Sequence, residues 1–592
     1  MFSRRIKVLA ATLLALTIPL ALTGEEKKPN PALARSNENA QVLITVFSRF
    51  SPEGAGFFGV SDMDEQIFDL KPGLTERSIA ATEEAVAVLK GRLATEKDPG
   101  VRQDLEILIE AAEESIEGTK LTQKLQIPYF SLTETVFRGI RVLLDDQVTP
   151  ERRVKAIVRL KRYAGMDAGV TPIATLAKDR IRERLTVAGL IGPFRGEIEK
   201  DLGNSAAFVD GIGKLFEKYK ISGYQEAHAK LKQQIADYDA FVRAEVLPRA
   251  RTDFRLPPEL YAYSLRQFGI DMPVEELTGR AKAAFREIQN EMQTLAPLVA
   301  KEKGLTVTDY RDVIRELKKA QLVGDKILPH YEARIKDLER LIVEKRIVTL
   351  PARQMRIRVA SEAESAATPA PNLQPPRLIG NTGEMGTFVL PLKVPGKPGA
   401  EALSFDDFTF EAASWTLTVH EGRPGHELQF ASLVEKGVSI ARALFAFNSV
   451  NVEGWGLYAE AEMKPYFPLD GQLISLQHRL MRAARAHLDP GLQMGTITRE
   501  EATRVLRDNV VVSEAMALQE VERYTFRAPG QAPSYFCGYS RLMELRADAE
   551  RVLGKDFDRL KFHDFILAQG LLPPTLLRKA VMGEFVPKKK AA

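Results

Sequence analysis

The chain has 592 residues, of which 45% are hydrophobic and 27% are charged, a composition that is ordinary for a folded globular protein and far from that of a disordered one. A chain of this length could hold about three or four domains, but large helical enzymes often form one body, so length alone does not fix the number. The formal net charge at pH 7 is only +4.

The first residues have the pattern of a secretory signal peptide. A basic segment at residues 4–7 precedes an apolar run at residues 8–22, and Gly24 offers a small residue at the cleavage position. The apolar run is short for a membrane-spanning helix. We therefore expect a signal peptide over residues 1–24 and an exported protein, periplasmic or secreted, with no stable membrane insertion after cleavage. An uncleaved anchor is the alternative.

Charge and cysteine content narrow the range of partners. Removing residues 1–24 takes away three basic residues and no acidic ones, so the net charge falls from +4 to +1. A nearly neutral protein does not offer the concentrated basic face that a nucleic acid or a membrane surface requires, so we expect no nucleic-acid partner. The single cysteine, Cys537, allows no disulfide within the chain, so stability must come from a buried core. The oligomeric state stays open.

A linker is expected at residues 25–40, and from there the pattern is helical as far as about residue 345. The clearest stretch forms an apolar stripe with charges between its members, as on one face of a helix. Its apolar residues are spaced 3, 4, 3 and 4 apart: Phe285, Ile288, Met292, Leu295 and Val299. We expect a helical N-terminal part over residues 41–345.

The residue composition and periodicity change at about residue 346. Eight of the chain's 33 prolines lie between residues 351 and 398, and the helical period is lost. A long extended insert in a helical protein is unusual and is often functional. We expect an extended insert at residues 346–403, at the start of a catalytic part that covers residues 346–592 and forms one continuous fold with the first part.

Two segments of the insert have the residue types of short strands. They are residues 355–359 and residues 386–392. In zinc peptidases an edge strand beside the metal helix pairs with an extended substrate, and residues 388–392 would suit that role. A structural flap is the alternative.

Two histidines flank a glutamate in the segment His420-Glu421-Gly422-Arg423-Pro424-Gly425-His426. Zinc hydrolases with two histidines four residues apart place both on one helix face, and the glutamate beside the first acts as general base on an activated water. Here the spacing is six residues, about 600° of ideal helix, so the side chains would point roughly 240° apart. They converge only if the helix is interrupted, and Pro424-Gly425 is suited to break it. The sequence predicts a bent helix at this dipeptide.

A catalytic zinc site needs a third protein ligand, often a carboxylate. Glu453 follows His426 by 27 residues and lies in an apolar stretch, where a buried carboxylate needs a partner. Glu460 lies 7 residues further on, on the same helix face, and could orient a histidine from behind or substitute as ligand. The alternative for both acids is pairing with buried arginines such as Arg482 or Arg485.

Four motifs occur in order along the chain: H-E-x-x-P-G-H-x-x-Q, E-G-W-x-x-Y-x-E, P-G-Q-A-x-S-Y-x-x-G-Y-x-x-x-x-E-L-R and F-H-D. They occupy residues 420–429, 453–460, 529–546 and 562–564. With this set the sequence is similar to the bacterial domain-of-unknown-function family numbered 885, over nearly all of the chain after the signal peptide. That family is grouped with the gluzincin-type metallopeptidases. The resemblance implies a mainly α, large helical metallopeptidase-like fold with a small extended insert near the metal site, a central cleft and a Zn²⁺ cofactor.

The resemblance also implies roles for residues of the later motifs. Tyr535 or Tyr539 would donate a hydrogen bond to the oxyanion of the reaction. His563 is a second candidate hydrogen-bond donor and would lie just outside the metal ligands. Arg541 and Arg546 could bind a substrate carboxylate. The alternatives are a core position for each tyrosine, a structural cap for the histidine, and ion pairs with neighbouring glutamates for the arginines.

The sequence departs from the family pattern at two positions. Members commonly have a second histidine after P-G-H, where this chain has Glu427, and a D-x-G-x-H run that here ends in Gln493. If the histidine at the second position contacts substrate in relatives, specificity here would differ. The metal set of His420, His426 and Glu453 is intact.

Together these patterns predict an exported zinc metallopeptidase that acts on short peptides, with Glu421 as general base. Two alternatives stay open. One is a metal-dependent amidase or esterase that acts on a small non-peptide substrate. The other is a non-catalytic binding protein, which the retained Glu421 argues against, because a degenerate site would lose its base early.

Overall fold

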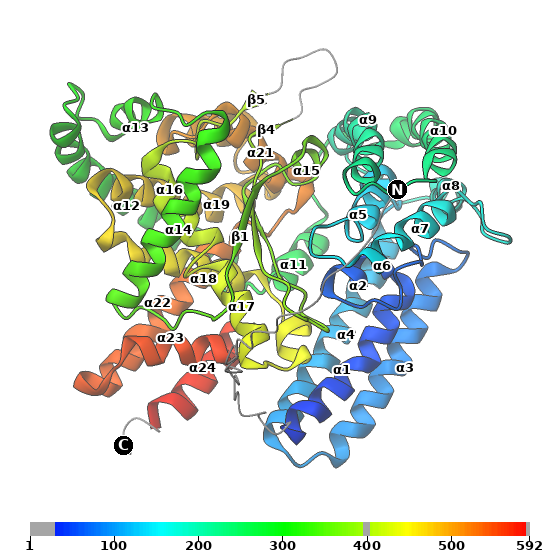
Figure 1. Ribbon diagram of the computed structural model, residues 1–592, viewed down its shortest axis with the longest axis horizontal. Coiled ribbons are helices and arrows are strands. Elements are labelled where there is room, and N and C mark those ends of the chain that lie inside the picture. Colours follow the sequence, from blue (N-terminus) through cyan, green and yellow to red (C-terminus); the bar gives the residue numbers. More distant parts are fainter. Residues whose placement is uncertain (1–29, 395–402, 588–592) are drawn as a thin grey trace, which may run out of the picture.

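The computed structural model describes residues 30–394 and 403–587. Over these ranges the protein is mainly helical, with one three-stranded and one two-stranded sheet (Figure 1). The predicted fold class, a large helical protein with a small β insert, is therefore confirmed. The expected signal peptide, residues 1–24, lies outside the described residues.

The N-terminal helices form the blue-to-green half of Figure 1 and enclose two apolar cores. One core lies between α1, α3 and α4, and the other is built mainly by α5 and α7 to α10. These helices are α1 (Pro31–Phe50), α2 (Pro52–Phe58), α3 (Leu74–Thr95), α4 (Pro99–Leu125), α5 (Leu132–Arg141), α6 (Pro150–Arg153), α7 (Lys155–Tyr163), α8 (Ile173–Leu185), α9 (Arg195–Lys218) and α10 (Gln225–Phe241).

The expected linker at residues 25–40 is wrong for residues 31–40, which form the first half of α1. The side chain of Asn30 accepts a hydrogen bond from the backbone N–H of Ala32 at 3.0 Å, so it caps the helix, and Pro31 takes the first helical position. Proline is favoured there because its missing N–H has no partner in a helix anyway. The buried face of α1 packs against α3 and α4.

The next four helices are α11 (Pro258–Gln267), α12 (Val274–Lys303), α13 (Tyr310–Lys318) and α14 (Ile327–Glu344). The predicted apolar stripe lies on α12, where Ile288, Met292 and Val299 are buried. This face packs along α19 (Leu469–Gln493), which belongs to the second part of the chain. One apolar core therefore crosses the predicted boundary at residue 346.

The extended insert forms both small sheets. Strand β3 (Thr387–Leu390) lies between β1 (Arg356–Val359), to which it is parallel, and β2 (Asn372–Gln374), to which it is antiparallel. Strands β4 (Lys393–Val394) and β5 (Leu403–Ser404) pair with each other. The two predicted strand segments contain β1 and β3. The prediction that residues 388–392 form an edge strand for substrate pairing is wrong, because β3 has a partner on each side and is buried along its length.

The remaining helices include α16, α17 and α18, the elements that carry the candidate metal ligands. They are α15 (Glu362–Ala367), α16 (Glu411–Glu421), α17 (His426–Lys436), α18 (Ser449–Met463), α20 (Arg499–Arg504), α21 (Glu514–Glu522), α22 (Ser534–Leu553), α23 (Arg559–Ala568) and α24 (Pro574–Ala580). Short 3-10 and π-helical turns link several elements: η1 (Val242–Val246), η2 (Leu247–Arg249), η3 (Gly324–Lys326), η4 (Ala441–Phe445), η5 (Lys464–Tyr466), η6 (Val505–Val510), η7 (Arg523–Arg527), η8 (Gly554–Asp556) and η9 (Val581–Phe585).

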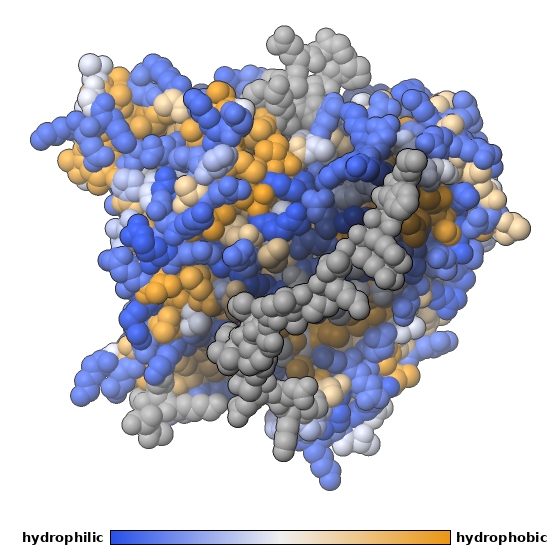
Figure 2. Space-filling model, in the orientation of Figure 1, coloured by the Kyte–Doolittle hydropathy of each residue, from blue (hydrophilic) through white to orange (hydrophobic). Residues whose placement is uncertain are grey.

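The surface in Figure 2 is mostly hydrophilic, with hydrophobic residues in separate patches. The candidate ligands lie beneath the surface, since His420 and His426 are both buried. None of the helices in the described ranges combines the length and the apolar character needed to cross a bilayer.

Candidate metal centre

The helix that carries the first histidine is interrupted where the sequence predicts. Helix α16 ends at Glu421 and α17 begins at His426, with the Pro424-Gly425 dipeptide between them. The backbone N–H of Gly425 donates to the carbonyl of Val419 at 2.9 Å, which folds the turn back onto α16. A Cβ on Gly425 would lie 2.2 Å from the carbonyl oxygens of His420 and Val419. Only glycine fits this close approach.

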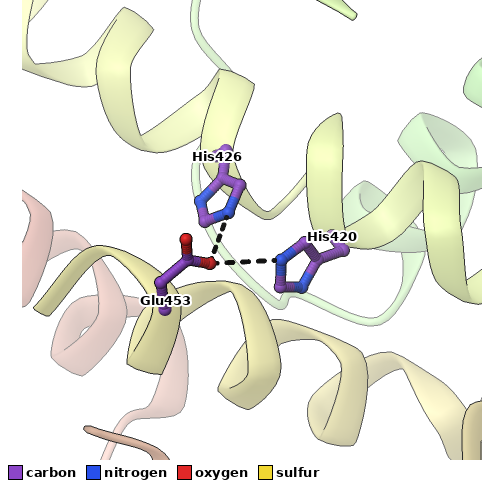
Figure 3. Close-up of side chains that lie close together, drawn as sticks. All are labelled: His420, His426 and Glu453. Carbon is purple, nitrogen blue, oxygen red and sulfur yellow. Dashed lines mark ion pairs between the residues drawn. The ribbon is translucent and has the colours of Figure 1, made fainter. Parts of the chain in front are cut away.

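The turn brings both histidines to one carboxylate (Figure 3). The Nε2 atom of His420 lies 3.5 Å from Oε2 of Glu453, and the Nε2 atom of His426 lies 3.2 Å from the same oxygen. Glu453 projects from α18, which approaches closely because Gly456 faces the rings. A Cβ on Gly456 would lie 2.7 Å from Cε1 of His420.

This arrangement fits a metal ion. Ligand atoms bound tetrahedrally at about 2.1 Å from zinc are about 3.4 Å apart, close to the two separations of 3.5 Å and 3.2 Å found here. One potential ligand atom from each of His420, His426 and Glu453 lies within 4.8 Å of the others. Oε2 of Glu453 is buried and has no hydrogen-bond partner in the described part of the chain. These three residues could hold a metal ion.

Glu460 lies behind His420, as the helix spacing predicts. Its Oε1 lies 2.7 Å from Nδ1 of His420, and its Oε2 accepts a hydrogen bond from the Thr416 hydroxyl at 2.8 Å. Arg482 lies 3.2 Å from the same carboxylate. Although burial alone raises the pKa of Glu460, Arg482 and His420 lower it to about 2. The carboxylate therefore stays ionised and orients the ring. Glu460 contacts both His420 and Arg482, the two partners that the sequence suggested.

Glu421 shares a cavity with His420. It is the last residue of α16 and lines a small cavity of about 70 Å³ next to the metal-ligand cluster. Burial raises the pKa of Glu421 above its ordinary value. Within the described residues, no hydrogen bond or ion pair engages its carboxylate, so the group is available for proton transfer. All residues that line this cavity come from the part after residue 346.

The structure separates the two candidate tyrosines. Tyr535, in the first turn of α22, is buried, and its ring lies nearly parallel to that of His420 with a centroid separation of 6.1 Å. It lines the cavity with Glu421. Tyr539, one turn further along, is not among the lining residues and packs against an apolar cluster under the guanidinium of Arg479. Of the two, Tyr535 is placed to act in the cavity.

The prediction that His563 is a donor or partner of the metal site is wrong. The side chain is buried, with Nδ1 2.8 Å from the carbonyl oxygen of Ile347 and Nε2 2.8 Å from the hydroxyl of Tyr458. Burial lowers the pKa of His563 to about 3. The neutral ring therefore joins α23 to α18 and to the segment after α14, as a structural cap does.

Arg541 and Arg546 both lie in ion pairs, which was the alternative to the prediction that they bind a substrate carboxylate. Arg541 pairs with Asp271 at 3.1 Å and Glu544 at 3.3 Å and lines a different cavity. Arg546 pairs with Glu462 and, at 2.8 Å, with Glu550. Each guanidinium is engaged by acidic neighbours away from Glu421 and His420, which sequence spacing alone could not exclude.

Three other arginines line the metal cavity instead. Arg482 and Arg485 come from α19 and Arg523 from η7. A sequence signal existed for two of them, because His478, Arg482 and Arg485 are spaced four and three apart on a helix whose other residues are largely apolar. Charged groups on the buried face of a helix need a specific reason to be there. The position of Arg523 carried no such signal.

The two departures from the family pattern are structural positions in this chain. The carboxylate of Glu427 accepts a hydrogen bond from Nε of Arg423 at 2.6 Å. The side chain of Gln493 donates to the carbonyl of Tyr524 at 2.7 Å and accepts from the backbone N–H of Leu256 at 2.9 Å. Neither residue lines the metal cavity.

Comparisons with known proteins agree with this architecture. A solved structure described as a candidate lipoprotein from Colwellia psychrerythraea is similar with a TM-score of 0.74 at 18% identity, covering 94% of this chain and 99% of its own. Another, a candidate lipoprotein of unknown function from Shewanella oneidensis, has a TM-score of 0.69 at 19% identity, covering 93% and 99%. Both show a shared fold.

A third solved structure, described as a candidate oligoendopeptidase F from Bacillus anthracis, has a TM-score of only 0.26 at 10% identity, covering 87% of this chain and 96% of its own, too low to support an argument. The comparison with curated proteins gave no match. The family described as Bacterial protein of unknown function (DUF885) matches residues 52–581. The match spans most of the chain, and the protein belongs to this family.

Proposed function

We propose that this protein is a zinc-dependent hydrolase that cleaves peptide bonds of short peptides. The observation that carries the proposal is the placement of Glu421. Its carboxylate follows His420 directly, has no partner among the described residues and faces the cavity beside His420, His426 and Glu453. A purely structural metal site has no use for an unpaired acid at this position, whereas a hydrolase needs one as general base.

The ligand set favours zinc. Two imidazoles and one carboxylate leave one of four tetrahedral positions open, the arrangement of catalytic zinc sites. Imidazole ligands favour zinc and other transition metals over calcium and magnesium, which prefer oxygen ligands. Glu460 fixes the ring of His420 through Nδ1, as carboxylates commonly do for zinc-binding histidines.

The protein's own side chains have defined roles in this reaction. A zinc ion held by His420, His426 and Glu453 would supply Lewis-acid activation of a water molecule and of the substrate carbonyl. Glu421 accepts a proton from the attacking water and returns it to the leaving amine. Arg523 donates to the hydroxyl oxygen of Tyr535, so the phenol keeps its own proton to donate to the carbonyl oxygen as negative charge develops there.

Burial of the site limits the substrate. The residues that line the cavity beside the metal ligands include His420, Glu421 and Tyr535, and all three are buried. A folded protein chain cannot reach residues this deep, so we propose short peptides as substrates.

We also propose that the protein is exported and works in the periplasm or outside the cell. The residue pattern at positions 1–24 is that of a secretory signal, and the two similar solved structures are described as candidate lipoproteins. This chain has its single cysteine at position 537 and none behind the signal, so lipid attachment there is not proposed.

Hydrolysis by the wild type and by Glu421→Gln tests the proposed function. We expect the zinc-loaded wild type to cleave members of a mixed library of short peptides, and we expect the variant to bind zinc but to lose at least about a hundredfold in rate. Small non-peptide amides and esters are assayed in parallel, because cleavage of these alone would indicate an amidase or esterase. Equal rates for the two proteins would overturn the assignment of the base.

A further inference from the structure

The cavity beside the metal cluster carries an unusual amount of positive charge. Arg482, Arg485 and Arg523 line it together with Glu421 and Tyr535. The first two are deeply buried, with residue exposures of 4% and 5%. Guanidinium groups stay charged at any accessible pH, so they need anionic partners when they are removed from water.

Only two carboxylates lie within 4 Å of these three guanidinium groups in the described part of the chain. Arg482 lies 3.2 Å from Glu460, and Arg485 donates to Glu520 through Nε at 2.6 Å and through Nη2 at 2.8 Å. For Arg523, whose side chain is 23% exposed, the nearest acid is the same Glu520, at 3.9 Å. One positive charge in this group therefore has no carboxylate of its own.

Two buried donors of these arginines also have no acceptor. Nε of Arg482 and Nη1 of Arg485 are inaccessible to solvent and have no hydrogen-bond partner among the described residues. A buried charged donor without an acceptor costs free energy, and an anionic ligand in the cavity would remove that cost. These donors point to a ligand that carries oxygen acceptors and negative charge.

The other ionisable groups that line the cavity do not supply the missing charge. Asp407 is paired with Lys318 at 2.8 Å. Lys318 also pairs with Asp406 at 2.8 Å, but Asp406 is half exposed to water and does not line the cavity, so solvent screens its extra negative charge. Burial lowers the pKa of His478 to about 3, so its ring is neutral near pH 7. Glu421 and Glu453 together balance the two charges of a divalent ion. The uncompensated charge of the arginine group is thus +1, which matches a carboxylate better than a phosphate dianion.

Tyr535 connects the arginine group to the metal cluster. Its ring lies 6.1 Å from that of His420 on one side, and the guanidinium carbon of Arg485 lies 4.3 Å from the ring centroid. Nη1 of Arg523 lies 3.3 Å from its hydroxyl oxygen. An anion held by these arginines is therefore separated from the metal ligands by a single aromatic side chain, a distance that one amino-acid residue of substrate spans.

We propose that Arg482, Arg485 and Arg523 bind a carboxylate of the substrate, so that the protein prefers peptides with a free carboxylate close to the bond that is cleaved. The position of that bond and the charge count rest on the proposed function, whereas the unpartnered donors of Arg482 and Arg485 do not. The carboxylate has two possible sources, the C-terminus of a peptide or an acidic side chain.

Binding to the zinc-loaded Glu421→Gln variant tests this inference without turnover. Calorimetric titration compares three probes: trialanine, trialanine amide, and the amide of Ala-Glu-Ala. We expect at least one of the two acidic probes to bind about ten to a hundred times more tightly than the neutral amide, because charge-assisted hydrogen bonds are gained. A gain for trialanine alone identifies the C-terminal carboxylate, and a gain for Ala-Glu-Ala amide alone identifies the side chain. Equal binding of all three would overturn the inference.

Variants of Arg523 assign the effect to the arginine group. In the same background, Arg523→Gln is expected to remove most of the preference and Arg523→Lys to retain part of it, since the charge is kept but the planar fork is lost. Arg541→Gln, in the other cavity, is the matched control and should leave the preference unchanged. Retention of the full preference by both Arg523 variants, with normal thermal unfolding, would contradict the assignment.

The two proposals fail separately. A wild type that cleaves none of the peptides, while its Glu421→Gln variant still prefers acidic probes, would refute the proposed function and leave the carboxylate site standing. A wild type that cleaves all three probes with equal efficiency, and binds them equally, would refute the carboxylate site alone.

Discussion

Replacement of Glu460 by glutamine perturbs the metal site without touching a ligand. Oε1 of Glu460 lies 2.7 Å from Nδ1 of His420, and the same carboxylate is held by Thr416 and Arg482. Glutamine keeps the shape of the side chain but removes the negative charge. Its NH₂ group, a donor, would also face another donor, on His420, Thr416 or Arg482, in either orientation of the amide. Losing a carboxylate that supports a zinc-bound histidine commonly lowers metal affinity by about ten to a hundredfold, or about 1.4 to 2.7 kcal/mol.

The assay is competition for zinc against a chelating indicator dye, with the dissociation constant measured for each protein at one pH. Glu462→Gln is the matched control, because Glu462 lies on the same helix and loses an ion pair with Arg546 but touches neither histidine. We expect the Glu460 variant to weaken zinc binding at least tenfold and the control to leave it within about twofold. Unchanged affinity in the Glu460 variant would refute the idea that this carboxylate orients His420.

Two further predictions test the packing around the site and the role of His563. A methyl group on Gly456 would lie 2.7 Å from His420 and 3.0 Å from His426, so Gly456→Ala should weaken zinc binding by about tenfold or more in the dye assay. Gly279→Ala is the control, because nothing lies near a Cβ at that position, and it should leave zinc binding unchanged. Equal zinc affinities of Gly456→Ala and the wild type would contradict the close approach. Because burial lowers the pKa of His563 to about 3, below about 6.5 in the unfolded chain, the unfolded state binds more protons and stability falls as pH drops below about 6.5. In chemical denaturation, the free energy of unfolding of His563→Gln should therefore lose about 2 kcal/mol less than that of the wild type between pH 7 and pH 5; equal losses would show that His563 is not held neutral.

The backbone of the candidate site could be predicted from local chemistry. The six-residue spacing of His420 and His426 required an interruption, and Pro424-Gly425 supplied residues that cannot continue a helix. Glu453 and Glu460 were predictable because acids in an apolar helix need partners. The helical class and the strands at β1 and β3 followed from periodicity and residue type.

Contacts between distant segments could not be predicted from the sequence. Arg541 and Arg546 lie in the motif that also contains Tyr535, but their acidic partners include Asp271 and Glu462, which come close only in the folded chain. The position of β3 in the centre of its sheet depends on β2, whose three residues carry little signal of their own. A sequence pattern identifies residues that need a partner, whereas the fold decides which partner each one finds.

The central claim is that His420, His426 and Glu453 together bind one zinc ion, and the metal content of purified protein tests it most directly. After exposure to zinc and dialysis against metal-free buffer, we expect elemental analysis to find about one zinc per chain in the wild type and in Glu421→Gln, and almost none in His426→Ala or Glu453→Ala. A wild type that retains no zinc, or a folded Glu453→Ala that retains a full equivalent, would contradict the account.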